Sequence, residues 1–361
     1  MKQINIIPFL FIAAMALGFF SLVSGVFLDD TDSENRQLKE RPQWNKNNAL
    51  TDEVPRLLQE YAGYYRDHYP FKSAVFKTYA ALQNCMGAEP LPRKVVHGTE
   101  GWMFLGDIHS NSIRESKGIL KLSDDEVNKL KQNLTTLQHQ MQGLNAPYYI
   151  AIARNKHSVY GEYLPITQQQ PTLLHQFVAA AGAVQMPVVD MGELYAQHSD
   201  SLLYYKSDSH WNGWGAYWGY VALMQELQRQ FPQLELIELS DLKVRQVNRQ
   251  GGLNRLLDIP ETERQPVLEM KEPRARKTEQ LGRGRVRYKS NVNELKVLVW
   301  HDSFGPDLRR FLKESFGESV FISGYALDEE LIRQEQPDLV IQQVVERKLD
   351  LYVSGLPAVS N

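Results

Sequence analysis

The chain has 361 residues, of which 43% are hydrophobic and 23% are charged, the composition of an ordinary globular protein. Its formal net charge of -3 offers no general attraction for a nucleic acid, so a nucleic-acid partner is not expected. The single cysteine, Cys85, excludes an intramolecular disulfide and a zinc site built on several cysteines.

Residues 1–28 are predicted to be a membrane anchor. The run from Ile6 to Leu28 is uncharged and mostly apolar, and it is about as long as the ~20 residues that cross a bilayer as a helix. Lys2 before the run and Asp29-Asp30 after it fit an amino end in the cytoplasm. A cleaved signal peptide is the alternative, although no convincing small-residue cleavage site follows. In both cases the remainder of the chain is expected to be exported.

Residues 29–90 are interpreted as a polar linker followed by a helical segment. Aromatic and apolar residues recur at helical spacing from Val54 to Leu82, which indicates packing against a neighbour. A hairpin is predicted from Val95 to Asp107, because Gly98 and Gly101 interrupt short apolar pieces there.

Helices and short apolar strands alternate through the rest of the chain, residues 91–361. Ser123 and Glu126 form the capping-box pattern at the start of one helix. The other expected helices cover 172–181, 213–231, 306–316 and 328–334, and the expected strands cover 147–153, 186–191, 295–300, 319–323 and 337–345. Continuous apolar strands that alternate with helices predict an α/β domain of three α/β/α layers with a mostly parallel sheet. The basic run from Arg274 to Ser290 is interpreted as a solvated loop, or else as a surface for an anionic polymer.

Two stretches carry candidate catalytic residues. Ser303 follows a strand and precedes a helix in the stretch VLVWHDSFGPDLRRFL, so its hydroxyl is expected near free backbone N–H groups. Serine is a weak nucleophile unless a histidine oriented by a carboxylate activates it. Asp208 and His210, in YYKSDSHWNGWGAYWGY, supply that pair, and active sites collect at the carboxyl ends of parallel strands. A metal site that adds His301 or Asp302 is the rival, but no recognised metal spacing is present.

Aromatic residues surround the histidine in sequence. Trp211 is next to His210 and is the expected wall of the pocket. Trp214, Tyr217 and Trp218 fall at helical spacing and are expected in the core.

Several of these stretches together resemble one known family. They are YYKSDSHWNGWGAYWGY, HDSF after a strand, GTEGWMFLGD, ARNKHSVYGEYLP and PDLVIQQVVERKL. From about Glu34 to Leu349 the chain is similar to the SGNH-like polysaccharide O-acetyltransferases of the AlgJ/AlgX type, which include proteins named for a D-H-H-W motif. The resemblance implies a circularly permuted SGNH fold in which Asp208 and His210 precede Ser303. The absence of a further module after VERKL makes the chain more similar to AlgJ.

The resemblance also implies an activity and partners. Acetyl groups would pass to an exported polysaccharide, alginate-like or another, and a membrane-bound O-acyltransferase would supply them in the periplasm, beside other polysaccharide synthesis and export proteins. No cofactor or metal is implied. The family's P-N-K is Arg154-Asn155-Lys156 here, and His301 replaces the usual glycine before Asp-Ser.

The resemblance and the residues around Ser303 also suggest which residues line the site. Tyr160 and Arg347 become site-lining candidates, with packing for Tyr160 and an ion pair for Arg347 as alternatives. Backbone N–H groups near Ser303 and Phe304, with the Asn155 side chain, are expected to hold the oxyanion. Two other functions stay open. With water as acceptor, the same three residues make an acetyl esterase. Without catalysis, the chain would be a scaffold that binds polymer or holds an export complex together, an alternative that stays open if His301 crowds the turn. Otherwise His301 would add a second imidazole to the site.

Overall fold

The computed structural model describes residues 41–44, 50–67, 94–108, 110–164, 166–282 and 284–355. The chain divides into two compact units, Met1–Leu91 with Asn254–Pro260 and Pro92–Leu253 with Glu261–Asn361. The expected anchor, residues 1–28, lies outside the described residues, as does most of the aromatic segment beyond residue 67. In the described part of the chain, none of the helices combines the length and the apolar character needed to span a bilayer.

In the first unit, helix α2 covers Leu50–Asp67. Arg56 donates to Glu60 one helical turn later over 2.7 Å and also pairs with Glu53. Pairs at these spacings lie on one side of a helix and stabilise it locally. The amino-terminal half of the predicted aromatic segment is therefore helical.

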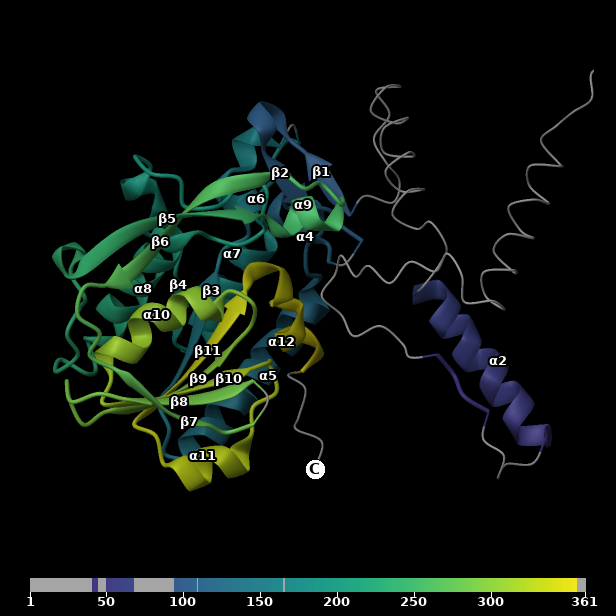
Figure 1. Ribbon diagram of the computed structural model, residues 1–361. Coiled ribbons are helices and arrows are strands. Elements are labelled where there is room, and N and C mark those ends of the chain that lie inside the picture. The colour runs from purple at the N-terminus through teal and green to yellow at the C-terminus, as the bar shows by residue number, and fades with distance from the viewer. Residues whose placement is uncertain are drawn as a thin grey trace, which may run out of the picture. The chain divides into compact units, whose positions relative to one another are not determined.

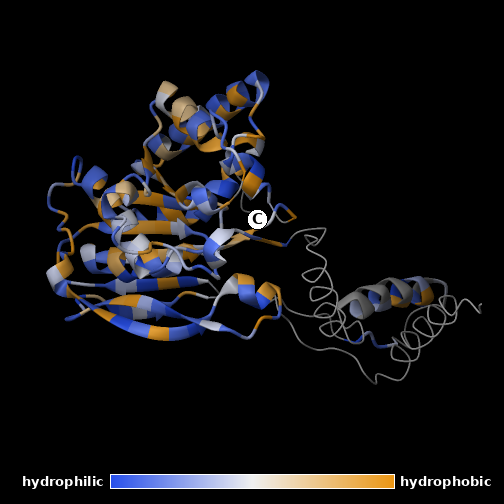
Figure 2. Cartoon of the chain, turned by 90° about the horizontal axis from the view of Figure 1, so that it is seen from above, coloured by the Kyte–Doolittle hydropathy of each residue, from blue (hydrophilic) through white to orange (hydrophobic). Residues whose placement is uncertain are grey.

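The second unit is built on a seven-stranded sheet (Figure 1). Its strands, in spatial order, are β4 (Val188–Asp190), β3 (Tyr148–Ala153), β11 (Leu339–Val345), β9 (Lys296–His301), β10 (Glu318–Ser323), β8 (Arg285–Lys289) and β7 (Arg276–Gln280). The first five run parallel to one another, β8 runs antiparallel to β10, and β7 runs antiparallel to β8. Every residue of β3 and β11 is buried, as the continuous apolar runs predicted. Figure 2 shows hydrophobic residues running through the middle of the sheet.

Helices cover both faces of this sheet, so the expected layers are present. One core joins the sheet to α8 (Gly213–Leu227) and α10 (Gly305–Ser315). A second core, on the other face, joins it to the helices α5 (Asp124–Gly143), α7 (Leu173–Ala183), α11 (Glu329–Glu335) and α12 (Asp350–Ser354). The predicted capping box at the start of α5 is confirmed, because Ser123 and Glu126 each bond the other's backbone N–H.

Short elements and two ribbons complete the unit. The predicted hairpin is confirmed as β1 (Val95–His97) paired with β2 (Met103–Leu105). The remaining short helices are α4 (Ser112–Ser116), α6 (Lys156–Val159), α9 (Gly252–Leu256), and the single turns Thr99–Gly101, Gly161–Tyr163, Tyr195–His198, Leu239–Asp241 and Glu346–Lys348.

The sequence did not predict the long ribbon of β5 (Leu242–Gln250) and β6 (Thr262–Met270). The solvated-loop interpretation of the basic run was wrong, because β7 and β8 pair antiparallel within it and β8 joins β10 in the sheet.

Candidate active site

Ser303 lies in a tight turn between β9 and α10, at the carboxyl edge of the sheet. The carboxylate of Asp302 fixes this turn on two sides. Its Oδ1 accepts from the N–H of Phe304 over 2.9 Å, and its Oδ2 accepts from the N–H of Val345, the last residue of β11, over 2.7 Å. Ser303 itself is exposed. The turn therefore presents one hydroxyl to solvent from a backbone that is tied to the neighbouring strand.

His210 joins Ser303 to Asp208. Its Nε2 lies 2.8 Å from Oγ of Ser303, and its Nδ1 lies 2.6 Å from Oδ1 of Asp208. The same Oδ1 accepts from the backbone N–H of His210 over 3.0 Å, and Oδ2 accepts from the N–H of Gly252 over 2.6 Å. Both imidazole nitrogens are thus engaged, one by a carboxylate and one by a hydroxyl. This is the arrangement in which an imidazole can remove a proton from serine.

Hydrogen bonds with residues of two further elements, α6 and β6, hold the loop that carries Asp208. The ammonium group of Lys156, at the start of α6, donates to the backbone oxygens of Tyr205, Lys206 and Asp208 over 3.0, 3.0 and 2.6 Å. On another side, the carboxylate of Glu263 in β6 accepts from the N–H and the hydroxyl of Ser207 over 3.1 and 2.5 Å. The loop therefore keeps one conformation without being part of the sheet.

Electrostatics keep Asp208 ionised. Burial would raise the pKa of its carboxyl, but the hydrogen bonds and charge of His210 and the N–H of Gly252 outweigh burial and hold the pKa well below its ordinary value. Lys156 is only 1% exposed, and this burial lowers its pKa to about 7 although Asp208 and Glu263 favour its charged form. An ionised carboxylate behind an imidazole stabilises the imidazolium that forms during proton transfer.

His301 does not enter the site. Its imidazole is 3% exposed, and its Nδ1 lies 2.8 Å from the backbone oxygen of Asp302. The ring fills the space beside Gly305, where any Cβ would overlap it. Burial lowers the pKa of His301, so the ring stays neutral. The expectation that His301 crowds the nucleophile is corrected: the side chain supports the first turn of α10 from behind.

The oxyanion donors differ from those expected. The N–H of Phe304 is bonded to Asp302, and the N–H of Gly305 donates to the Asp302 oxygen over 3.1 Å. Among the described residues, no acceptor is found for the N–H of Ser303, so this is the backbone donor left for an oxyanion. Phe304 contributes its ring instead, which is 1% exposed and lies 4.8 Å from the His210 ring.

Asn155 already uses both ends of its side-chain amide in hydrogen bonds within the protein. Its side chain is fully buried, with Nδ2 donating to Ser116 over 3.2 Å and Oδ1 accepting from Arg347 over 3.2 Å. Its backbone N–H donates to the buried carboxylate of Glu346 over 2.7 Å. Burial raises the pKa of that carboxyl despite the donors Asn155 and Ser158. Asn155 therefore supports Arg347, whose guanidinium lies 5.5 Å from the centre of the Phe304 ring.

Tyr160 and Trp211 lie away from the opening of the site. Tyr160 stacks on Trp102 at 4.2 Å, and its hydroxyl accepts from the N–H of Leu203 over 2.8 Å, which is the packing alternative. Trp211 is fully buried and meets the ring of Phe304 edge-on at 5.2 Å. The expectation that Trp211 forms the pocket wall is corrected, because it packs behind Phe304. Tyr217 lies in the core, and Trp214 and Trp218 pack against it, as expected.

Three residues of this site were not found by the sequence analysis: Lys156, Glu263 and Gly252. Lys156 stood in the quoted Arg-Asn-Lys stretch, but nothing in the sequence showed that its ammonium reaches three carbonyl oxygens. Glu263 lies on the unpredicted strand β6. A Gly-Gly pair at 251–252 was a signal for close backbone approach, since a Cβ at Gly251 would overlap Ser207.

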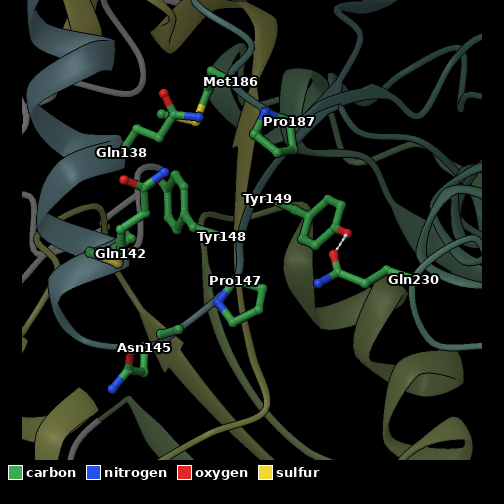
Figure 3. Close-up of a pocket in the computed structure, with 11 residues that line it drawn as sticks. Gln138, Gln142, Asn145, Pro147, Tyr148, Tyr149, Met186, Pro187 and Gln230 are labelled. Carbon is green, nitrogen blue, oxygen red and sulfur yellow. Dashed lines mark hydrogen bonds between the residues drawn. The ribbon is translucent and has the colours of Figure 1, made fainter.

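A cavity of about 440 Å³ lies elsewhere in the described part of the chain. Figure 3 shows it at the amino end of β3, where Pro147 and Tyr148 face Met186 and Gln138. The triad residues lie at the opposite, carboxyl edge of the sheet. Within the described residues, no group of three or more His, Cys, Asp and Glu side chains is placed to hold a metal ion.

A known protein family matches the part of the chain that carries Ser303, His210 and Asp208. The profile of the "SGNH hydrolase-like domain, acetyltransferase AlgX" family matches residues 95–322, well over half of the chain and all three residues of the triad. The chain belongs to this family. The AlgX-type match covers β1 through β10, so it includes the strand and the turn that carry Ser303. The resemblance noted from the sequence is thereby confirmed.

Two solved structures with TM-scores above 0.5 share the fold of this chain at low identity. PatB1 of Bacillus cereus is 15% identical with a TM-score of 0.55, over 71% of this chain and 96% of that one. A DHHW family protein of Eubacterium siraeum is 14% identical with a TM-score of 0.52, over 75% of this chain and all of that one. The O-acetyltransferase domain of Pseudomonas putida AlgJ is 18% identical with a TM-score of 0.47, over 71% and 91%. No curated protein sequence matches the chain.

Proposed function

We propose that the chain is an O-acetyltransferase that acetylates hydroxyl groups of an exported polysaccharide through Ser303, His210 and Asp208. The observation that carries this proposal is the single imidazole held between an ionised carboxylate and an exposed serine hydroxyl, at 2.6 and 2.8 Å. Membership of the AlgX-type acetyltransferase family supports acetyl transfer as the reaction class. The acceptor, a hydroxyl group of an exported polysaccharide, is part of the proposal, and so is the existence of an acetyl donor.

The first half-reaction loads the serine. Oγ of Ser303 attacks the carbonyl carbon of an activated acetyl ester or thioester while its proton passes to Nε2 of His210. The Ser303 N–H donates to the oxygen that becomes negative. The proton on His210 then moves to the leaving group, the bond between the acetyl carbon and the leaving group breaks, and acetyl-Ser303 remains.

The second half-reaction reverses these roles. A sugar hydroxyl gives its proton to Nε2 of His210 and attacks the acetyl carbon. The bond to Oγ breaks, and the proton on His210 returns to Ser303. Asp208 keeps Nδ1–H pointed at its carboxylate in both halves, which holds the tautomer that the reaction needs. No cofactor or metal takes part in these steps.

The proposal includes a place and partners. The apolar run from Ile6 to Leu28 would hold the chain at the inner membrane with its body in the periplasm, or direct its export and be removed. A membrane-bound O-acyltransferase would supply acetyl groups there, beside other polysaccharide synthesis and export proteins. The acceptor is the polysaccharide, and no nucleic acid is involved.

One observation favours the esterase as a second candidate. Ser303 is exposed, so water can reach an acetyl group on Oγ. The main argument for a non-catalytic scaffold was crowding by His301. That argument is removed, because His301 is buried behind the turn and leaves the Ser303 hydroxyl exposed.

The test uses the purified full-length chain, an activated acetyl ester and a panel of oligosaccharides, with products identified by mass spectrometry. The Ser303→Ala variant removes the nucleophile. Ser323→Ala is the matched control, since Ser323 is also exposed and ends the adjacent strand β10. Acetylated sugar that requires Ser303 supports the transferase. Free acetate alone that requires Ser303 replaces it with the esterase. Turnover that does not depend on Ser303 refutes both.

A further inference from the structure

The cavity of about 440 Å³ lies at the amino edge of the sheet, opposite the edge that carries the triad (Figure 3). Its lining comes from α5, from the starts of β3 and β4, and from the turn after α8. Strand β3, of six residues, spans the sheet from this edge to the other, which is about 20 Å at ~3.3 Å per residue. The cavity is therefore a separate place from Ser303.

None of the eleven described residues that line this cavity carries a charge. Charged residues make up 23% of the chain, so their complete absence from this set is unusual for this protein. The phenols of Tyr148 and Tyr149 are the titratable groups of the described lining, and burial raises the pKa of both, so they stay neutral. A charged ligand would lose its hydration here and gain no opposite charge, which is unfavourable. The lining therefore favours a neutral ligand.

The floor of the cavity is apolar because prolines precede two neighbouring strands. Pro147 comes directly before β3, and Pro187 comes directly before β4. Neither residue has a backbone N–H, and their carbonyl oxygens already accept from Val340 and Ile150 over 2.7 and 3.0 Å. The side chain of Met186 adds further apolar surface. The floor can therefore pack against an apolar face of a ligand, such as the C–H face of a sugar ring, but offers it little hydrogen bonding.

Amide side chains supply hydrogen-bonding groups at the rim, on both sides of β3. Figure 3 shows Gln142 beside Tyr148 on one side of the strand and Gln230 beside Tyr149 on the other. The Tyr149 hydroxyl donates to Oε1 of Gln230 over 2.6 Å, which fixes this amide and leaves its Nε2 without a partner among the described residues. Gln142 is exposed, and its amide has no partner in the described part of the chain. The rim therefore offers both donors and acceptors, which suits hydroxyl groups because each of them donates and accepts.

The course of the cavity favours an elongated ligand. Tyr148 and Tyr149 are successive strand residues that point to opposite faces of the sheet, so the cavity crosses the end of β3 from one helical layer to the other. A peptide that adds to a sheet needs free backbone groups along a strand, and these proline-led strand ends do not present them. A chain of neutral sugars offers C–H faces to the floor and hydroxyl groups to the rim. The volume lies within the ~300–1,000 Å³ of ligand sites.

We propose that this cavity is a second polysaccharide site, which binds uncharged sugar residues and holds the polymer on the enzyme between transfers at Ser303. The choice of a polysaccharide as the ligand rests on the function proposed above, whereas the site itself lies apart from the triad. A polymer that is bound at one place has a raised local concentration at another place on the same protein. The second site therefore assists transfer without touching the reacting atoms.

The test measures binding at this cavity with turnover switched off. The purified full-length Ser303→Ala chain is mixed with three neutral hexamers, those of glucose, mannose and galactose, or with mannuronate and glucosamine hexamers as charged comparisons. Hydrogen exchange read by mass spectrometry locates the bound sugar. Slower exchange at residues 138–149 is expected with at least one neutral hexamer and with neither charged hexamer. The hexamer concentration that gives half of this protection measures the affinity of the cavity, whatever binds beside Ser303.

Two variants with matched controls test the rim. Gln230→Glu keeps an acceptor for the Tyr149 hydroxyl, removes the free Nε2 donor and adds a charge, so it is expected to weaken this affinity about tenfold or more. Gln225→Glu, which adds the same charge at an exposed position of α8 outside the cavity, is expected to leave it unchanged. Gln142→Ala is expected to weaken the affinity several-fold, and Gln132→Ala, also exposed on α5, to leave it unchanged. Thermal melting of each variant checks the fold.

The results separate the second site from the function on which its ligand rests. No protection of residues 138–149 by any neutral hexamer at millimolar concentration, equal protection by a charged hexamer, or an unchanged affinity in folded Gln230→Glu protein would each overturn the second site. Acetyl transfer that needs Ser303 would then leave the proposed function standing. Protection that needs Gln230, together with transfer that does not need Ser303, would keep the second site and remove the proposed function.

Discussion

The ammonium nitrogen of Lys156 lies 2.6 Å from the backbone oxygen of Asp208, the residue whose carboxylate holds the imidazole of His210. The same nitrogen binds two more carbonyl oxygens of that loop and has almost no contact with solvent. We therefore predict that Lys156 acts on the proposed reaction by positioning this loop.

Replacing Lys156 by methionine should therefore damage catalysis more than binding. Loss of three donors from carbonyl oxygens is expected to lower kcat about 10- to 100-fold with KM nearly unchanged, because the imidazole is displaced. The free energy of unfolding should fall by ~1–3 kcal/mol. Lys271→Met is the control, since Lys271 is exposed and donates to one carbonyl, that of Ser240, over 2.7 Å. An unchanged kcat in folded Lys156→Met protein would show that the lysine serves stability alone.

Asp208→Asn should leave the fold intact and remove most of the rate. The amide keeps the size of the carboxylate, but it no longer favours the Nδ1–H tautomer or the imidazolium that forms during the reaction. A loss of about 10³- to 10⁴-fold in kcat/KM for the acetyl ester is expected. Asp200→Asn, on an exposed turn, is the matched control. A loss in kcat/KM no larger than that of the Asp200→Asn control would argue against Asp208 as the partner of His210.

His157 should make the protein sensitive to acid. Its Nε2 donates to the Leu105 oxygen over 2.8 Å, and burial lowers its pKa from 6.5 to about 3. Between pH 6.5 and about 3 the unfolded chain therefore binds one proton more than the folded chain, so stability falls as the pH falls through this window.

The variant His157→Gln keeps a donor for Leu105 and does not titrate. Its free energy of unfolding should depend less on pH in that window, by about 1.4 kcal/mol per pH unit. Urea unfolding at several pH values measures this slope. Identical slopes in the two proteins would contradict a buried neutral imidazole at position 157.

His301 and Gly305 should behave as a coupled pair. A Cβ at Gly305 would overlap the imidazole of His301, so Gly305→Ala is expected to destabilise the chain and disturb the nucleophile turn. In a His301→Gly background, which also removes the His301 Cβ that would lie 2.4 Å from the added Cβ, the same change has room, and the double variant should be more stable than the sum of the two single effects by ~1–3 kcal/mol. Chemical unfolding of the four proteins gives this coupling directly. Additive effects would mean that the imidazole is not what demands glycine at 305.

Sequence patterns predicted the centre of the fold well, because the buried strands and helices there have characteristic patterns of apolar residues. β3 is a continuous apolar run, β11 is apolar apart from Gln342 and Gln343, and α5 carries its apolar residues in one stripe behind a capping box. The sequence of the ribbon formed by β5 and β6 has no such pattern of apolar residues. Most residues of β5 are exposed, and the alternation of apolar and polar residues in its sequence lasts only from Leu242 to Arg245, which is too short to mark a nine-residue strand. β7 is an edge strand of five exposed residues, three of them charged, which resembles a loop in sequence.

The site was predictable in part for a similar reason. Motif logic predicted that Ser303, His210 and Asp208 would meet, and the structure brings them within hydrogen-bond distance. Their catalytic roles stay predictions. Side-chain direction was not predictable: Trp211 follows His210 in an extended segment, where successive side chains point to opposite sides, and so it enters the core. Contacts to backbone carbonyls, such as those of Lys156, depend on loop conformation and leave no pattern in sequence.

The central claim is that Ser303 carries the acetyl group between donor and acceptor. The most direct measurement is peptide mass spectrometry of the full-length chain, mixed with an activated acetyl ester without acceptor and stopped in acid within the first turnover. One acetyl group on Oγ of Ser303, absent when His210 is replaced by alanine, is the result expected. An unmodified Ser303 peptide, or an acetyl group found only on another residue, would contradict the account.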